Sequence, residues 1–178
     1  VRVWEEYPGG VSPAGNRWLS RSTYAVWREH ARTIDAVGGH TLQERQLTLG
    51  VERVNVFGAA VSPAVLATLG VVPALGRFLT DDDGRDGGPA VVILSDELWR
   101  ERYGSSPGVL GASLAIDGTA HTIVGVAPPA FAFPDPRVRF WVPFVIPRAA
   151  TAAEGAIVFT ALARLKPEAL IVGSSFAE

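Results

Sequence analysis

A serine-centred pattern is the first feature that could carry out chemistry. Residues 104–108 read Gly-Ser-Ser-Pro-Gly, which fits G-x-S-x-G, the turn that presents a nucleophilic serine in many hydrolases. In that turn the serine follows a strand, and the next residue donates its N–H to the oxyanion. Here the pattern follows a predicted helix, and Pro107 has no N–H to donate. We interpret it as a turn that ends a helix; a free-standing α/β hydrolase that uses Ser106 with His121 is the alternative.

A run of three carboxylates, Asp81-Asp82-Asp83, could bind a cation. The residues that follow, 84–86, read Gly-Arg-Asp and do not match the spacing of a calcium-binding loop. Adjacent carboxylates repel one another unless a positive group is near, and Arg77 is the nearest candidate. We predict a solvated structural loop in which Arg77 pairs with one of the aspartates; a cation site is the alternative.

The three histidines, His30, His40 and His121, do not have the spacing of metal ligands, and we interpret them as surface residues. The sequence also lacks the glycine-rich loops that bind nucleotide phosphates. We therefore expect no catalytic residue, no cofactor and no metal ion. Any use of ATP must take place in another domain or subunit.

Composition narrows the class of protein. The 178 residues suit one domain, or one domain of two closely packed lobes. The net charge is −2 and the Lys and Arg residues are scattered, so we expect no nucleic acid partner. Cysteine and methionine are both absent, so the core forms without disulfides and the chain is expected to be a segment of a longer one. The uncharged stretch Val54–Gly76 is long enough to span a membrane, but Pro63 and Pro73 divide it, so we expect a soluble chain.

Hydrophobic periodicity and turn residues predict an α+β fold with a mixed sheet, hairpins and short helices. Residues 1–21 are rich in Gly, Pro and Arg and are predicted to be irregular. Helices are predicted at residues 23–32, at 63–69 between Ser62 and Gly70, and at 96–103 between Ser95 and Gly104. Strands are predicted at residues 34–40, 44–50, 51–60, 90–94, 140–142 and 157–165, and in a hairpin over 112–126 that turns at Asp117-Gly118.

Taken together, these segments resemble one family. The stretch VSPAVLATLGVVPALGRFLTDDD is followed by PAVVILSDELWRERYGSSPGVLGASLAIDGTAHTIVGVAPPAFAFPD and then by FWVPF. This combination resembles the MacB-like periplasmic core domain of ABC transporter permeases of the macrolide-exporter and FtsX type, and most of all the large orphan permeases. The resemblance covers about residues 20–168. It divides the chain into an N-terminal segment (1–21), the core domain (22–168) and a C-terminal tail (169–178).

The positions that match the family pattern are interpreted as structural. They are Gly76, Arg77, Asp83, Trp99, Gly111, Gly125, Phe131, Pro134, Trp141 and Pro143. Four aromatic residues near the end of the pattern, Phe131, Phe133, Phe140 and Trp141, are expected to form one cluster. Core packing explains such a cluster, and an exposed patch that binds a partner is the alternative.

The resemblance implies a non-catalytic domain outside the cytoplasmic membrane, anchored by membrane helices of its parent permease. It implies as partners an ABC ATPase subunit or domain, a second permease copy and a periplasmic partner protein. The implied role is mechanotransmission, in which the domain conveys motion driven by ATP hydrolysis to a substrate or partner. A secreted binding module that uses the aromatic cluster is a further alternative. Without membrane helices, we expect the isolated chain to be a monomer.

Overall fold

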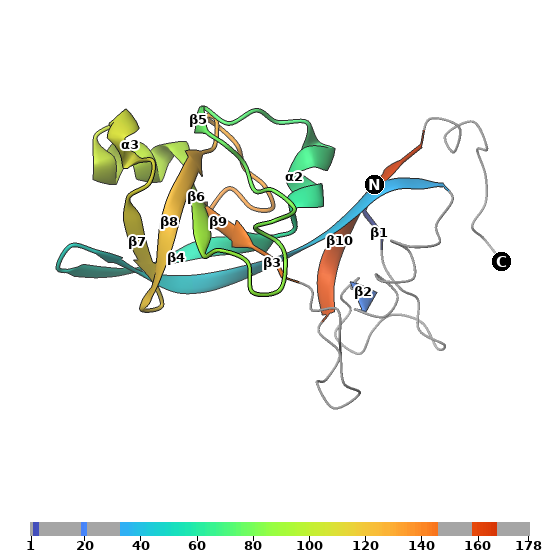
Figure 1. The fold of residues 1–178 in the computed structure, drawn as a ribbon, viewed down its shortest axis with the longest axis horizontal. Coiled ribbons are helices and arrows are strands. Elements are labelled where there is room, and N and C mark those ends of the chain that lie inside the picture. The colour runs from blue at the N-terminus through green and yellow to red at the C-terminus, as the bar shows by residue number, and fades with distance from the viewer. Residues whose placement is uncertain (1, 4–18, 21–32, 146–157, 167–178) are drawn as a thin grey trace. The chain divides into compact units, whose positions relative to one another are not determined.

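The computed structural model describes residues 2–3, 19–20, 33–145 and 158–166 (Figure 1). The chain divides into two compact units, residues 1–39 with 149–178 and residues 40–148. Close packing of two lobes stays a prediction. The predicted helix at 23–32 and the tail 169–178 lie outside the described residues. Within the described ranges, no helix has both the length and the apolar character needed to cross a membrane.

The first unit contains short strands that the sequence did not indicate. Strand β10 (Val158–Leu165), predicted at 157–165, pairs antiparallel with β1 (Arg2–Val3) and with β2 (Leu19–Ser20). The prediction of irregular structure throughout residues 1–21 is therefore wrong at these two places. A strand of two residues is too short to leave a periodic pattern, which explains why it was missed.

A single long strand replaces two of the predicted ones. Strand β3 (Ile34–Leu49) runs without interruption, and its residues 40–49 pair in continuous antiparallel register with β4 (Glu52–Val61). The sequence predicted that one strand ends at residue 40 and that the next begins at residue 44, yet the structure has no break between them. The turn between β3 and β4 lies at Gly50, whose φ is 65°, where the sequence predicted the boundary between strands 44–50 and 51–60. The prediction of a break at residues 41–43 is therefore wrong, because polar residues also fit partly exposed positions within a strand.

The strands of the second unit form a mixed sheet whose pairings close into a ring. The remaining strands are β5 (Leu75–Gly76), β6 (Val91–Leu94), β7 (Ser113–Ile116), β8 (Thr119–Val126) and β9 (Val138–Pro143). In the ring, β3 is followed by β4, β9, β6, β8 and β7, and β7 pairs with β3 again. The β4–β9 and β6–β8 pairs are parallel, the others antiparallel, and β5 adds to β8. This arrangement confirms the α+β class with a mixed sheet.

Two short α-helices begin and end at the predicted residues. Helix α2 (Pro63–Leu69) starts after Ser62 and ends at Gly70, which has a φ of 65°. Helix α3 (Asp96–Tyr103) starts at Ser95, whose Oγ accepts a hydrogen bond from the Leu98 N–H at 3.1 Å. In Figure 1 the two helices lie on either side of β6 and β8. The Asp117-Gly118 hairpin is also confirmed, with φ angles of 49° and 79°.

Two apolar clusters lie on opposite faces of the sheet. The first takes residues from all six strands of the ring and includes Phe140, whereas the second includes Trp141 and packs under α2. Consecutive residues of a strand point to opposite faces, so these two aromatic rings cannot share one cluster. The expected four-residue aromatic cluster is therefore wrong for Phe140. Both side chains are about 1% exposed, so neither belongs to a surface patch.

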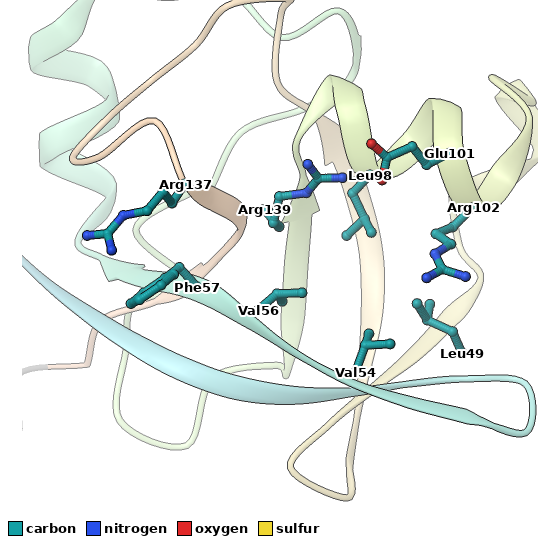
Figure 2. A pocket seen from close by; sticks show the side chains of 9 residues that line it. All are labelled: Leu49, Val54, Val56, Phe57, Leu98, Glu101, Arg102, Arg137 and Arg139. Atoms are coloured by element: carbon teal, nitrogen blue, oxygen red, sulfur yellow. Dashed lines mark hydrogen bonds and ion pairs between the residues drawn. The ribbon is translucent and has the colours of Figure 1, made fainter.

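A pocket lies at one end of the ring. Pairing of β9 with β4 begins at Phe57, so the preceding part of β4 extends beyond β9. There, side chains of β4, β9 and α3 surround a space of about 330 Å³ (Figure 2).

Candidate functional site

The serine of the G-x-S-x-G pattern is part of a turn. Gly104 and Ser105 both have positive φ and end α3, as predicted. The Ser106 Oγ accepts a hydrogen bond from the Gly108 N–H at 3.3 Å, within the same turn. His121 lies in β8, where its Nδ1 is 2.9 Å from the Thr119 carbonyl oxygen. The Ser106 and His121 side chains therefore each contact a residue of their own turn and not each other. Pro107, which has no N–H, cannot supply the oxyanion donor that a hydrolase needs.

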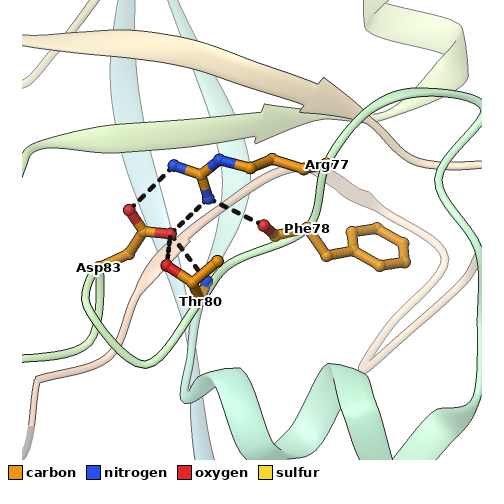
Figure 3. Close-up of polar contacts among 4 residues, drawn as sticks. All are labelled: Arg77, Phe78, Thr80 and Asp83. Atoms are coloured by element: carbon orange, nitrogen blue, oxygen red, sulfur yellow. Dashed lines mark hydrogen bonds and ion pairs between the residues drawn. The ribbon is translucent and has the colours of Figure 1, made fainter.

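The acidic loop is built around Asp83 rather than around a bound cation. The Arg77 guanidinium donates two hydrogen bonds to this carboxylate, Nη1 to Oδ2 at 2.6 Å and Nη2 to Oδ1 at 3.1 Å (Figure 3). The Thr80 backbone N–H and hydroxyl donate to the same Oδ2 at 2.7 and 2.9 Å. The predicted pairing of Arg77 with an aspartate is confirmed. These four donors satisfy both oxygens of the Asp83 carboxylate.

Burial distinguishes Asp83 from its neighbours. Its side chain is 2% exposed, whereas Asp81 and Asp82 are exposed. The prediction that all three carboxylates are solvated is therefore wrong for Asp83, because four hydrogen bonds compensate for the water it loses. Burial alone raises the pKa of Asp83, but the hydrogen bonds from Arg77 and Thr80 outweigh burial, and the net pKa lies below 3.8. The hydrogen bond to Asp83 raises the pKa of Arg77. Both groups stay charged at neutral pH.

Metal binding finds no support elsewhere in the described part of the chain. Within those residues, no group of three or more His, Asp and Glu side chains is placed to hold an ion. His40, predicted to lie at the surface, is buried at 8% exposure and packs edge-on against Phe133, with ring centroids 4.8 Å apart. The surface prediction is therefore wrong for His40, because the strand continues beyond residue 40 and His40 pairs with Val61 of β4.

Two glycines of the family pattern face each other where the acidic loop meets the sheet. Gly76 of β5 pairs with Gly125 of β8, and the Arg77 N–H donates to the Val124 carbonyl oxygen at 2.9 Å. A Cβ on Gly125 would overlap the carbonyl oxygen of Arg77, and one on Gly76 would overlap that of Val124. Gly76 also has a φ of 68°. Only glycine allows the two backbones to approach this closely.

An aromatic contact fixes the other side of the same loop. Phe78 packs against Phe131, and Phe131 packs against Trp141, with centroid distances of 6.2 and 5.1 Å. The Trp141 Nε1–H donates to the Phe133 carbonyl oxygen at 2.7 Å, immediately before Pro134. Residues 76–83 are thus held to the sheet by glycine packing and by aromatic contacts, and the Arg77–Asp83 ion pair closes the segment on itself.

The remaining pattern residues also connect loops to the sheet. The Trp99 Nε1–H donates to the Ser106 carbonyl oxygen at 2.8 Å and so closes the turn after α3. Gly111, with a φ of 83°, donates its N–H to Ile123 of β8 at 2.8 Å. Pro143 ends β9 opposite Val61. Sequence reasoning missed Thr80, although a hydroxyl residue three positions before an aspartate is a recognisable turn signal.

The chain matches the family model of the MacB-like periplasmic core domain over residues 1–172. No curated protein sequence matches it. Three solved structures are similar in fold. The extracellular domain of the noncanonic ABC-type transporter YknZ from Gram-positive bacteria has a TM-score of 0.68 at 12% identity, covering 93% of this chain and 83% of that one.

The other two comparisons point to the same fold. The periplasmic region of MacB from Actinobacillus actinomycetemcomitans has a TM-score of 0.70 at 15% identity, covering 94% of this chain and 74% of that one. A domain of a putative permease from Porphyromonas gingivalis has a TM-score of 0.58 at 19% identity, covering 85% and 62%. Because the family model matches nearly the whole sequence, the chain belongs to the MacB-like periplasmic core domains, the extracytoplasmic domains of ABC transporter permeases.

Proposed function

We propose that this domain is a non-catalytic body that couples ATP hydrolysis in the cytoplasm to the handling of a substrate or partner outside the membrane. The family match over residues 1–172 carries this proposal, because the family implies a permease that works with an ABC ATPase. The Ser106 geometry adds support, since it leaves the hydrolase alternative without an oxyanion donor.

The packing of the second unit is suited to transmitting motion. Its ring of strands encloses a filled apolar core, and close-packed interiors resist deformation. The loop between β5 and β6 is braced internally by the Arg77–Asp83 ion pair and is held to β8 where Gly76 packs on Gly125. A unit of this kind transmits displacement as a whole instead of absorbing it in its loops. The proposed partners are the membrane helices of the parent permease, its ATPase, a second permease copy and a periplasmic protein.

Distance measurements in the parent permease test the coupling. This chain contains no cysteine, so introduced cysteines provide specific labelling sites here once others in the parent are replaced. Val51 and Val72 are highly exposed, at 101% and 75%, and both lie in the second unit. Spin labels on Val51→Cys report the distance between two permease copies by pulsed electron paramagnetic resonance. The permease–ATPase complex is measured without nucleotide and with ATP plus vanadate.

The expected result is a change in the distance between copies on nucleotide trapping. In the matched control, labels at Val51→Cys and Val72→Cys of one copy, diluted with unlabelled copies, keep a constant distance. An unchanged distance between copies contradicts coupling, and a changed distance within one copy contradicts a rigid unit. Ester hydrolysis by the purified chain that disappears in Ser106→Ala would instead support an enzyme.

A further inference from the structure

The pocket at the end of the ring combines an apolar wall with guanidinium groups. Its wall is formed by apolar side chains of β3, β4 and α3, namely Leu49, Val54, Val56 and Leu98. Three arginines reach it from α3, from β9 and from the turn just before β9: Arg102, Arg139 and Arg137. Figure 2 shows the valines of β4 on one side and the arginines across from them. Its volume of about 330 Å³ is at the lower end of the range of small-molecule sites.

Basic residues outnumber acidic ones in the lining of this pocket, although each arginine is paired with a carboxylate. Three arginines line it against a single acidic residue, Glu101. One arginine is held in place: Arg137 donates to Asp135 through Nε at 2.9 Å and Nη2 at 3.0 Å, and it stacks on the Phe57 ring at 4.2 Å. Arg137 therefore forms a fixed end to the pocket.

The other two arginines have weaker partners. Arg139 pairs through Nη2 with Glu101, and Arg102 pairs through Nη1 with Glu52 at 2.8 Å. Glu101 and Glu52 are 58% and 60% exposed, and ion pairs with exposed partners are worth little. Within the described residues, each of these arginines uses one guanidinium nitrogen for its carboxylate, which leaves N–H donors for a ligand. Planar guanidinium groups bind carboxylates in bidentate geometry.

We propose that this pocket binds a small anionic amphiphile, a carboxylate on a medium-length aliphatic chain. The chain lies against the valines and leucines of the wall, and the carboxylate accepts hydrogen bonds from Arg139 and Arg102. A neutral chain leaves the guanidinium groups without a new partner, and a cationic one is repelled. The site is independent of the coupling role, so either proposal can fail without the other.

Decanoate is the probe for this site. It is titrated into the 178-residue chain below its critical micelle concentration, and binding is followed by calorimetry and by amide chemical shifts. We expect saturable binding of one molecule per chain, with the largest shifts at Val54, Val56 and Leu98. Replacement of Arg139 by Met keeps the aliphatic stem and removes the donors. It should weaken binding about tenfold, which corresponds to one charge-assisted hydrogen bond.

Matched controls separate this site from general adsorption. Arg100→Met changes an arginine of α3 that pairs with Asp96 and does not line the pocket, so it should leave affinity unchanged. Decanol and decyltrimethylammonium should bind at least tenfold more weakly than decanoate. If Arg139→Met does not fold, Arg102→Met takes its place. Failure of decanoate to bind, equal binding of the cationic chain, or equal loss in Arg100→Met overturns the proposal.

Discussion

Two arginine–aspartate bridges occupy different settings in the second unit. Arg77 and Asp83 approach to 2.6 Å, and Arg45 and Asp117 to 2.7 Å. In both, the aspartate also accepts a backbone hydrogen bond, from Thr80 at 2.7 Å or Gln46 at 2.9 Å. Asp83 accepts two further hydrogen bonds, from the second Arg77 nitrogen and the Thr80 hydroxyl, and the two aspartates also differ in exposure. Asp83 is 2% exposed and Asp117 is 40% exposed.

Exposure determines what each bridge contributes to stability. A buried carboxylate that loses its partner remains out of water, so the loss is large. An exposed carboxylate that loses its partner is hydrated by water instead, so the loss of stability is small. Hydrogen bonding to Arg45 lowers the pKa of Asp117, yet this group stays in contact with water in either state. Two ion pairs of similar length can therefore differ in how much they stabilise the fold.

The largest expected effect comes from removing the buried carboxylate. Asp83→Ala removes the buried acceptor of four hydrogen bonds from Arg77 and Thr80, and should lower the free energy of unfolding by about 3 kcal/mol. Urea unfolding followed by circular dichroism measures this. The matched control is Asp82→Ala, one residue away and 76% exposed, with an expected change within about 0.5 kcal/mol. Equal losses in the two variants would show that burial does not set the difference.

The next effect tests the close approach that positions the Arg77 loop. Gly125→Ala places a methyl group on the Arg77 carbonyl oxygen, so the loop must move away from β8, at an expected cost of about 2 kcal/mol. Gly108→Ala is the control, because its added Cβ meets only ordinary contacts and its φ is not positive. Urea midpoints of the two variants measure the contrast. A Gly125→Ala protein as stable as Gly108→Ala would contradict the close fit of β5 on β8.

Acidification should weaken the buried bridge. The folded pKa of Asp83 lies below the ordinary value of 3.8, so folding favours the charged form. Its stabilising effect is complete well above pH 3.8 and is lost as pH falls through the folded pKa. The difference in unfolding free energy between the native chain and Asp83→Asn should therefore shrink as pH falls from 7 into this acid range. A difference that grows on acidification would reverse the sign and refute the assignment.

The smallest effect is expected at the exposed bridge. Arg45→Met should cost less than about 1 kcal/mol, because both partners are about two-fifths exposed. Salt should reduce even this difference, since ions screen exposed charges. Thermal unfolding of native and variant chains at low and high salt measures both quantities. A loss as large as that of Asp83→Ala would remove the contrast between the two bridges.

The sequence predicted the features that depend on a few neighbouring residues. Ser95 and Gly104 marked the ends of α3, and Asp117-Gly118 marked a hairpin, because capping and turn chemistry act over about four residues. The pairing of Arg77 with an aspartate was predicted for the same reason. Which aspartate is buried was not predictable, since burial depends on packing with residues distant in sequence.

Features that join distant segments were missed. The ring requires β7 to pair with both β8 and β3, and only the first contact is local. The pocket combines residues of β3, β4, α3 and β9, whose arginines have no shared spacing in the sequence. The separation of Phe140 from Trp141 was different, because strand alternation alone predicts it once Val138–Pro143 is recognised as a strand.

The place of β9 has a consequence for biogenesis. It is the last strand of the second unit along the chain, yet it lies between β4 and β6. During synthesis from the N-terminus, β4 and β6 each have an unpaired backbone edge until β9, which ends at Pro143, has been made. Unpaired strand edges can pair with other chains. The sheet of this unit can therefore be completed only after β9 is synthesised, and a truncated chain that stops before Val138 is expected to aggregate.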